Sequence, residues 1–207
     1  MIRIEPEVIR KRLLNPLPGQ KSHRRMMVKG RSLICPDGDF VSSAILCALY
    51  NENGIWKTIF IKRPDRNPKD KHRGQIGFPG GKREATDDSL KDTALREANE
   101  EVGILPEQVD ILGKLSDLYI SVSNFMISPW VGYLNEKPRL IPQKNEVERI
   151  IETNIDDILN LNNATHLDMN IMNTFIRDIP GYSINGDFIW GATAMILSEF
   201  TDILKEI

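Results

Sequence analysis

The sequence lacks the features that mark several large classes of protein. It contains no apolar stretch long enough to cross a membrane, and the segment from Met1 to Arg12 mixes charged and apolar residues where a signal peptide would have an apolar core. It also lacks a strong excess of either charge, since the net charge is −2 and the pI is about 6.0. A general nucleic-acid or membrane-surface binder would be more basic. We therefore expect a cytoplasmic protein that binds neither nucleic acid nor membranes.

Cysteine is scarce as well. The two cysteines, Cys35 and Cys47, do not follow a metal-ligand spacing, and we expect both to be reduced and buried. No internal repeat, low-complexity tract or linker divides the chain. Its 207 residues, 41% of them hydrophobic, suffice for one domain with a proper core. We therefore expect a single domain over residues 1–207, with residues 1–40 as an N-terminal extension that packs on it.

Apolar patterns and turn residues predict an irregular alternation of helices and strands. Helical spacing of apolar residues predicts helices at residues 5–14, 88–102, 154–161 and 192–207. Apolar runs bounded by turn residues predict strands at 41–50, 55–63, 109–118, 125–134 and 188–190, and a short apolar element at 75–81. The charged segments 21–29 and 64–73 are expected to be loops. This alternation favours a mixed sheet with helices on both faces over a regular doubly wound fold.

The helix expected at residues 88–102 carries an acidic cluster. At about 100° per residue, Glu97, Glu100 and Glu101 fall within roughly 100° of arc on one side of the helix. An apolar stripe lies next to this cluster, and it is formed by Leu90, Ala94, Ala98 and Val102. The carboxylates therefore lie beside the buried face of the helix, where the wall of a cleft would be.

Three glutamates on a helix could also be a solvated acidic face. Two features argue against that alternative. Glu97 and Glu101 form a like-charge i,i+4 pair, and no Lys or Arg lies three or four residues from either of them. Arg96 can reach Glu100, although in the less favourable order. A divalent cation would supply the missing positive charge, and Mg²⁺ or Mn²⁺ prefers such hard oxygen ligands.

The glycines upstream complete a pattern. Gly80 and Gly81 allow a tight turn and the close approach of a ligand. The segment resembles the Nudix box, a glycine followed by a spaced acidic residue, Arg-Glu, Glu-Glu and a final glycine with an apolar residue. The matching positions are Gly81, Asp87, Arg96-Glu97, Ala98, Glu100-Glu101, Gly103 and Ile104. The resemblance implies a Nudix hydrolase domain, an α/β Nudix fold whose mixed sheet is sandwiched between helices (α/β/α), and metal-dependent cleavage of a diphosphate linkage.

Details around the box resemble the coenzyme A pyrophosphatase branch of that family. Asp87 in place of Glu, the longer spacing to Arg96 and the intact segment from His72 to Gly81 all match that branch. Pro64 departs from it, because the branch has a small residue there, and the charged loop after Pro64 is longer here. That loop is associated with coenzyme A recognition, so these departures concern the substrate and not the chemistry.

The resemblance also implies roles for individual residues. Glu97, Glu100 and Glu101 are expected to hold Mg²⁺ or Mn²⁺, one of them doubling as base, while Arg96 orients them. Asp87 is either an outer carboxylate or the helix N-cap, and Glu146 is a further candidate ligand or base. Expected substrate-binding residues are Arg63, Lys71, His72, Arg73, Gly80 and Gly81. The basic loop that contains some of them is equally compatible with a merely solvated loop.

The leading functional hypothesis is hydrolysis of coenzyme A or acyl-coenzyme A to 3′,5′-ADP and (acyl-)4′-phosphopantetheine. ADP-ribose, NADH and dinucleoside polyphosphates are the alternative small-molecule nucleotide substrates. A Nudix module that senses a nucleotide without cleaving it is the alternative from another class. Such modules usually lose box carboxylates, whereas all three are present here. The sequence leaves the possibility of a homodimer undecided. Phe125 and Trp130 are expected in the core.

Overall fold

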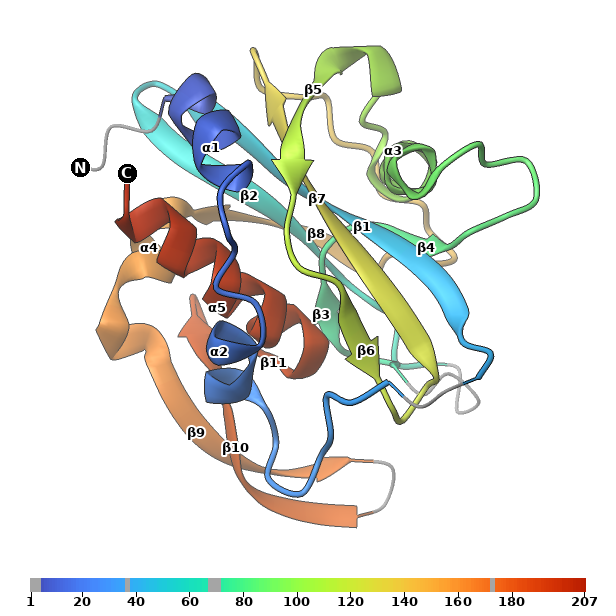
Figure 1. Ribbon diagram of the computed structural model, residues 1–207, viewed down its shortest axis with the longest axis vertical. Helices are drawn as coiled ribbons and strands as arrows, with labels where there is room; N and C mark the ends of the chain where they lie inside the picture. Colours follow the sequence, from blue (N-terminus) through green and yellow to red (C-terminus); the bar gives the residue numbers. More distant parts are fainter. Residues whose placement is uncertain (1–4, 36–37, 67–71, 172–173) are drawn as a thin grey trace.

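The computed structural model of the protein describes residues 5–35, 38–66, 72–171 and 174–207 (Figure 1). Its α-helices are α1 (Pro6–Leu13), α2 (Gln20–His23), α3 (Leu90–Val102), α4 (Ile155–Leu159) and α5 (Gly191–Lys205). Its strands are β1 (Val41–Glu52), β2 (Ile55–Lys62), β3 (Ile76–Gly77), β4 (Gly80–Lys82), β5 (Val109–Lys114), β6 (Leu118–Ile120), β7 (Phe125–Leu134), β8 (Arg149–Asn154), β9 (Ala164–Ile171), β10 (Thr174–Ile184) and β11 (Asp187–Trp190). Within these described ranges, no helix has the length and apolar character needed to span a membrane.

A mixed sheet forms the centre of the molecule. Strand β1 runs parallel to β7, from Val41 opposite Phe125 to Tyr50 opposite Leu134. The second half of β1 pairs antiparallel with β2, and its first half pairs with β4. The strand order is β3-β2-β1-β7-β5, with β6 on β7 and β8 on β2. The pairing of β4 with β1 brings the two glycines that open β4 to the middle of the sheet.

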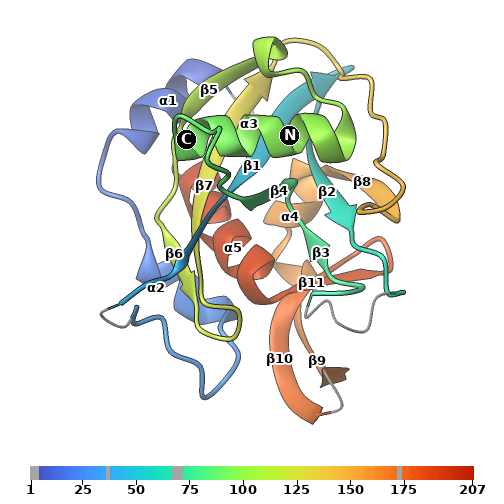
Figure 2. The ribbon, with the colours of Figure 1, turned by 90° about the vertical axis from the view of Figure 1, so that its right-hand side faces the viewer.

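Helices cover both faces of this sheet, as Figures 1 and 2 show. Helix α3 lies on one face, where Ala98 and Val102 pack against Leu46 of β1 and Ile59 of β2 in one hydrophobic cluster. Helices α1, α4 and α5 lie on the other face, and Phe200 is among the residues of the second cluster. The prediction of an α/β fold with a mixed sheet sandwiched between helices is confirmed.

The N-terminal segment packs on the α5 side. Ile9 and Leu13 of α1 are buried in the same cluster as Phe200 and Ile203 of α5. Ser22 and His23 of α2 are also buried. The segment 21–29, expected to be a loop, therefore contains α2 and a 3₁₀ turn at Arg24–Met26.

Other sequence expectations need correction. The single strand expected at 109–118 is two strands, because buried Glu199 accepts hydrogen bonds from the N–H and the hydroxyl of Ser116, at 3.2 and 2.6 Å, and removes Ser116 from strand pairing. Strands β8, β9 and β10 were not expected, since β9 and much of β10 are exposed and lack a strong apolar pattern. Cys47 is buried as predicted, but Cys35 is partly exposed.

Candidate active site

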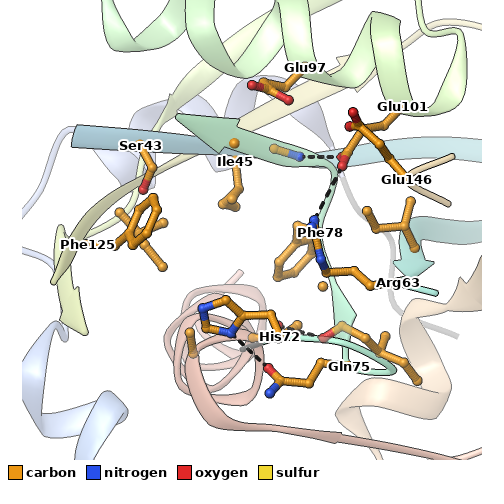
Figure 3. Close-up of a pocket in the computed structure, with 18 of the residues that line it drawn as sticks. Ser43, Ile45, Arg63, His72, Gln75, Phe78, Glu97, Glu101, Phe125 and Glu146 are labelled. Carbon is orange, nitrogen blue, oxygen red and sulfur yellow. Dashed lines mark hydrogen bonds and ion pairs between the residues drawn. The ribbon is translucent and has the colours of Figure 1, made fainter. Parts of the chain in front are cut away.

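A cleft of about 830 Å³ opens where α3, the β3–β4 segment, the β6–β7 hairpin, the start of α5 and the loop before β8 meet. Figure 3 shows Glu97 and Glu101 on its α3 wall, with Glu146 beside Glu101. Arg63 and His72 lie at another part of the wall, and Phe125 lies on the side opposite Arg63. The cleft thus contains acidic, basic and apolar surfaces.

The local sequence explains how α3 presents its glutamates. The Ser89 hydroxyl accepts a hydrogen bond from the backbone N–H of Asp92 at 3.3 Å and caps the N-terminus. Gly103 ends the helix with a φ of 78°, which glycine adopts without strain. Between these ends the apolar stripe is buried against the sheet, so Glu97 and Glu101 lie one turn apart beside the buried face.

Glu101 is almost completely buried, with 1% of its surface exposed. Its Oε2 accepts a hydrogen bond from the Gly80 N–H at 2.9 Å, and its Oε1 lies 3.8 Å from Nη1 of Arg63. Burial, together with the charges of Glu97 and Glu146, raises the pKa of Glu101 to about 8 against the opposing effects of Gly80 and Arg63. The carboxylate is therefore held in place but incompletely neutralised.

Glu97 lies against the backbone of Gly81. A Cβ at Gly81 would fall 2.4 Å from Oε1 of Glu97, and a Cβ at Gly80 would fall 2.4 Å from the carbonyl oxygen of Ala44. Larger residues at these two positions would displace the carboxylate or the strand. Burial also raises the pKa of Glu97, although Arg96, with Nη2 at 3.0 Å from Oε1, opposes that shift.

Arg96 and Asp87 lie outside the cleft wall and support it. Arg96 donates to Oδ1 and Oδ2 of Asp87 at 2.9 and 3.1 Å and to the carbonyl oxygen of Lys82 at 2.9 Å. Asp87 also accepts from the Thr93 hydroxyl, and chiefly the Arg96 guanidinium holds the pKa of Asp87 well below its usual range. The N-cap alternative for Asp87 is wrong, because Ser89 caps the helix.

The structure does not bring all the predicted metal ligands together. Glu97, Glu101 and Glu146 line the cleft, whereas the Glu100 side chain is 56% exposed and pairs with Nη1 of Arg96 at 3.0 Å. Among the described residues, no three His, Cys, Asp or Glu side chains are close enough to hold one ion. Glu146 approaches from the loop before β8, where its neighbour Val147 is buried.

The predicted substrate-binding residues divide into three groups. Arg63, His72, Gly80 and Gly81 line the cleft. Arg73 is not in the cleft wall, and its Nε lies 3.2 Å from Oδ1 of Asp65. Lys71 lies outside the described residues.

Sequence reasoning missed part of the cleft. Arg66 lines it, although no sequence pattern marks this residue. Phe125, expected in the core, forms with Ile120 and Ile127 an apolar surface on the β6–β7 hairpin. The Lys82 ammonium lies 5.6 Å from the Phe125 ring centroid. Strand periodicity predicts that Phe125 and Ile127 share a face, but it does not tell which face is buried.

Comparisons with known proteins identify the family of the chain. The family model described as NUDIX domain matches residues 41–172. An uncharacterized Nudix hydrolase NudL from Pectobacterium atrosepticum is 40% identical over 129 residues, which cover 62% of this chain and 66% of that protein. The NudL protein of Yersinia enterocolitica is 38% identical over 127 residues, 61% of this chain and 64% of that protein. The chain thus matches just under two thirds of the length of these relatives.

Solved structures resemble the fold at low sequence identity. The Caenorhabditis elegans Ap4A hydrolase in a binary complex gives a TM-score of 0.53 at 15% identity, covering 81% of this chain and 99% of that one. The MutT protein from Methanosarcina mazei gives 0.51 at 18% identity, covering 83% and 99%. At such identities the likeness concerns the fold alone.

Proposed function

The chain belongs to the NUDIX domain family, and from that membership we propose that it is a metal-dependent hydrolase that cleaves the diphosphate linkage of a nucleoside diphosphate derivative. The observation that carries this proposal is the pair of carboxylates at the cleft, that of Glu101 buried and that of Glu97 partly buried, in surroundings that raise the pKa of both. Both lie next to the Gly80-Gly81 backbone, where the absence of side chains leaves room for the Glu97 carboxylate and for strand β1.

The donor set fits Mg²⁺ or Mn²⁺. Carboxylate oxygens are the preferred ligands of these ions, and burial raises the pKa of both Glu97 and Glu101, a shift that a bound cation would oppose. We propose these two as ligands. Glu100 stays a predicted ligand whose side chain would have to leave Arg96. A bound ion would neutralise phosphate oxygens and lower the pKa of a coordinated water.

Other residues of the cleft would act as base, bind phosphate and position the ligands. We propose that Glu146 is the base that accepts a proton as a water oxygen attacks one phosphorus and the bond from that phosphorus to the bridging oxygen breaks. Arg63, next to Glu101, would bind a phosphate oxygen. Arg96 is a positioning residue, because it fixes Glu97 relative to the β4 backbone through Lys82.

For the substrate we propose coenzyme A or acyl-coenzyme A, with 3′,5′-ADP and (acyl-)4′-phosphopantetheine as products. Support comes from Asp87 with its longer spacing to Arg96, from the intact segment His72 to Gly81, and from the asymmetry of the cleft. Cationic Arg63 lies on the opposite side of the cleft from Phe125. Arg66 is a second cationic residue of the cleft wall, and Ile120 and Ile127 add to its apolar surface. A molecule with an anionic nucleotide and a long uncharged arm matches both surfaces. ADP-ribose, NADH and dinucleoside polyphosphates lack such an arm.

We also propose that residues 1–207 form one Nudix hydrolase domain, on which residues 1–40 pack as an extension. Support comes from the burial of Ile9 and Leu13 in the cluster that contains α5. The family match begins at Val41, where β1 begins. The cytoplasmic location and a homodimer stay predictions.

A turnover screen tests the function. The full chain is assayed with coenzyme A, acetyl-coenzyme A, ADP-ribose, NADH and diadenosine tetraphosphate, each with Mg²⁺ or Mn²⁺ and with excess chelator. We expect metal-dependent hydrolysis with the highest kcat/KM for one of the two coenzyme A species. A higher kcat/KM for ADP-ribose would overturn the substrate, and binding without turnover of any compound would favour the sensing module.

A further inference from the structure

We infer that Arg66 is a specificity-determining residue that binds a second phosphate of the substrate, a phosphate monoester separate from the diphosphate that is cleaved. The inference rests on the proposed function. Arg66 follows β2 at the beginning of the charged loop and lines the cleft together with Arg63 and His72. Nothing in the box or in the glutamate cluster points to it.

The guanidinium of Arg66 is held by backbone carbonyl groups. Its Nη2 donates to the carbonyl oxygens of Lys144 and Asn145, at 2.7 and 3.2 Å. These two residues directly precede Glu146, and the loop that carries them is attached to α3 through a bond from the Gln143 N–H to the Glu101 carbonyl oxygen at 3.0 Å. These hydrogen bonds therefore fix the position of Arg66 relative to α3 and the loop before β8, which carry the carboxylates of the cleft.

Carbonyl oxygens orient a guanidinium without neutralising it. Among the residues that the structure describes, no carboxylate lies within ion-pair distance of Arg66, and its Nε and Nη1 donate no hydrogen bond to any of them. A cation in a cleft with two donors still available is suited to a phosphate, since planar guanidinium groups bind phosphate oxygens in pairs.

The other described arginines of this region are used differently. Arg73, at the far end of the same loop, pairs with Asp65 and is absent from the cleft wall. Arg63 lies beside Glu101 and belongs to the part of the cleft where the diphosphate is expected. Of these three described arginines, Arg66 is therefore the one suited to bind an anionic group of the substrate that lies away from the cleaved linkage.

The experiment compares Arg66→Gln with a matched control, Arg73→Gln, from the same loop. For each protein kcat/KM is measured on coenzyme A and on 3′-dephospho-coenzyme A. Because Arg66 is exposed, solvent screening limits its contribution, and we expect Arg66→Gln to lower kcat/KM on coenzyme A by on the order of tenfold while sparing the dephospho form. Arg73→Gln should leave the ratio between the two substrates unchanged, and Arg66→Lys should retain part of the preference.

A binding measurement gives a readout that does not depend on turnover. Calorimetry with 3′,5′-ADP and with 5′-AMP should show that Arg66→Gln weakens only the bisphosphate, by about the same factor. Equal loss for both nucleotides, or a substrate ratio that Arg66→Gln leaves intact, overturns the inference. If the chain hydrolyses other diphosphates but neither coenzyme A species, the proposed substrate fails, and the two nucleotide affinities still decide the role of Arg66.

Discussion

Two glutamates, Glu101 and Glu199, are both fully buried, and they lie on opposite sides of the sheet. Glu199 accepts hydrogen bonds from the Gly19 N–H at 3.0 Å and from the Ser116 hydroxyl and N–H, and its Oε2 lies 3.0 Å from Nε2 of His23. Among the residues that the structure describes, Glu101 accepts from one backbone N–H, that of Gly80, and its Oε1 lies 3.8 Å from Nη1 of Arg63.

The pKa values move in opposite directions as a result. Burial by itself would raise the pKa of Glu199, but hydrogen bonds from His23 and Ser116 outweigh it and hold that pKa below its ordinary value. At Glu101 burial prevails and raises the pKa to about 8. Burial alone therefore does not identify a functional carboxylate. The proposed ligand Glu101 differs from Glu199 in that fewer donors compensate its charge, which suits a site for an external cation.

The largest expected effect concerns activity. Glu101→Gln should lower kcat by on the order of 10²–10³-fold, because it removes a carboxylate that is expected to act at the diphosphate. The amide oxygen can still accept the Gly80 N–H, so the thermal midpoint should not fall. Turnover and thermal unfolding of the same preparation check both statements. A folded variant with full activity would show that the ion is held elsewhere.

At Glu199 the same substitution should affect stability and not activity. Glu199→Gln should lower the free energy of unfolding by about 3 kcal/mol, because the amide oxygen can accept from the donors of only one carboxylate oxygen and the amide NH2 then faces the donors of the other. The kcat of the folded fraction should stay within about twofold of wild type, a change of less than 0.5 kcal/mol. Urea unfolding measured beside turnover tests this. Wild-type stability combined with lost activity would contradict the structural role of Glu199.

The sequence predicted much of the cleft but not this contrast. Helical periodicity predicted that Glu97 and Glu101 lie on one side of α3. The pattern could be recognised because these glutamates share one helix and the glycine turn at Gly80-Gly81 lies close to them in the sequence. Glu199 is satisfied by Gly19 and Ser116, which lie far from it in sequence, so no local pattern marks it. The role of Arg66 was not predicted for the same reason, because its orientation depends on the backbone carbonyl oxygens of residues 144–145, which are distant in sequence.

Metal binding provides a third test of the difference between Glu101 and Glu199. If Glu101 lacks a cation that Glu199 does not need, Mg²⁺ or Mn²⁺ should stabilise the folded protein without any substrate. At 100 times its dissociation constant a ligand contributes about 2.7 kcal/mol. The midpoint of unfolding should rise with metal in wild type and in Glu199→Gln, and should not rise in Glu101→Gln. An equal rise in all three proteins would place the binding away from the cleft.

The smallest effect is the pH dependence of stability at Glu199. Its folded pKa is depressed, so its contribution is fully present above the unfolded pKa of about 4.3 and is lost as the pH falls through the folded value. The stability difference between wild type and Glu199→Gln should therefore be constant near neutral pH and should shrink below about pH 4.3. Urea unfolding of both proteins at several pH values, without metal, measures that difference directly. A difference that instead grew as the pH fell would mean that Glu199 is protonated more easily in the folded state. The hydrogen bonds from Ser116 and Gly19 would then not favour the carboxylate, and the contrast with Glu101 would disappear.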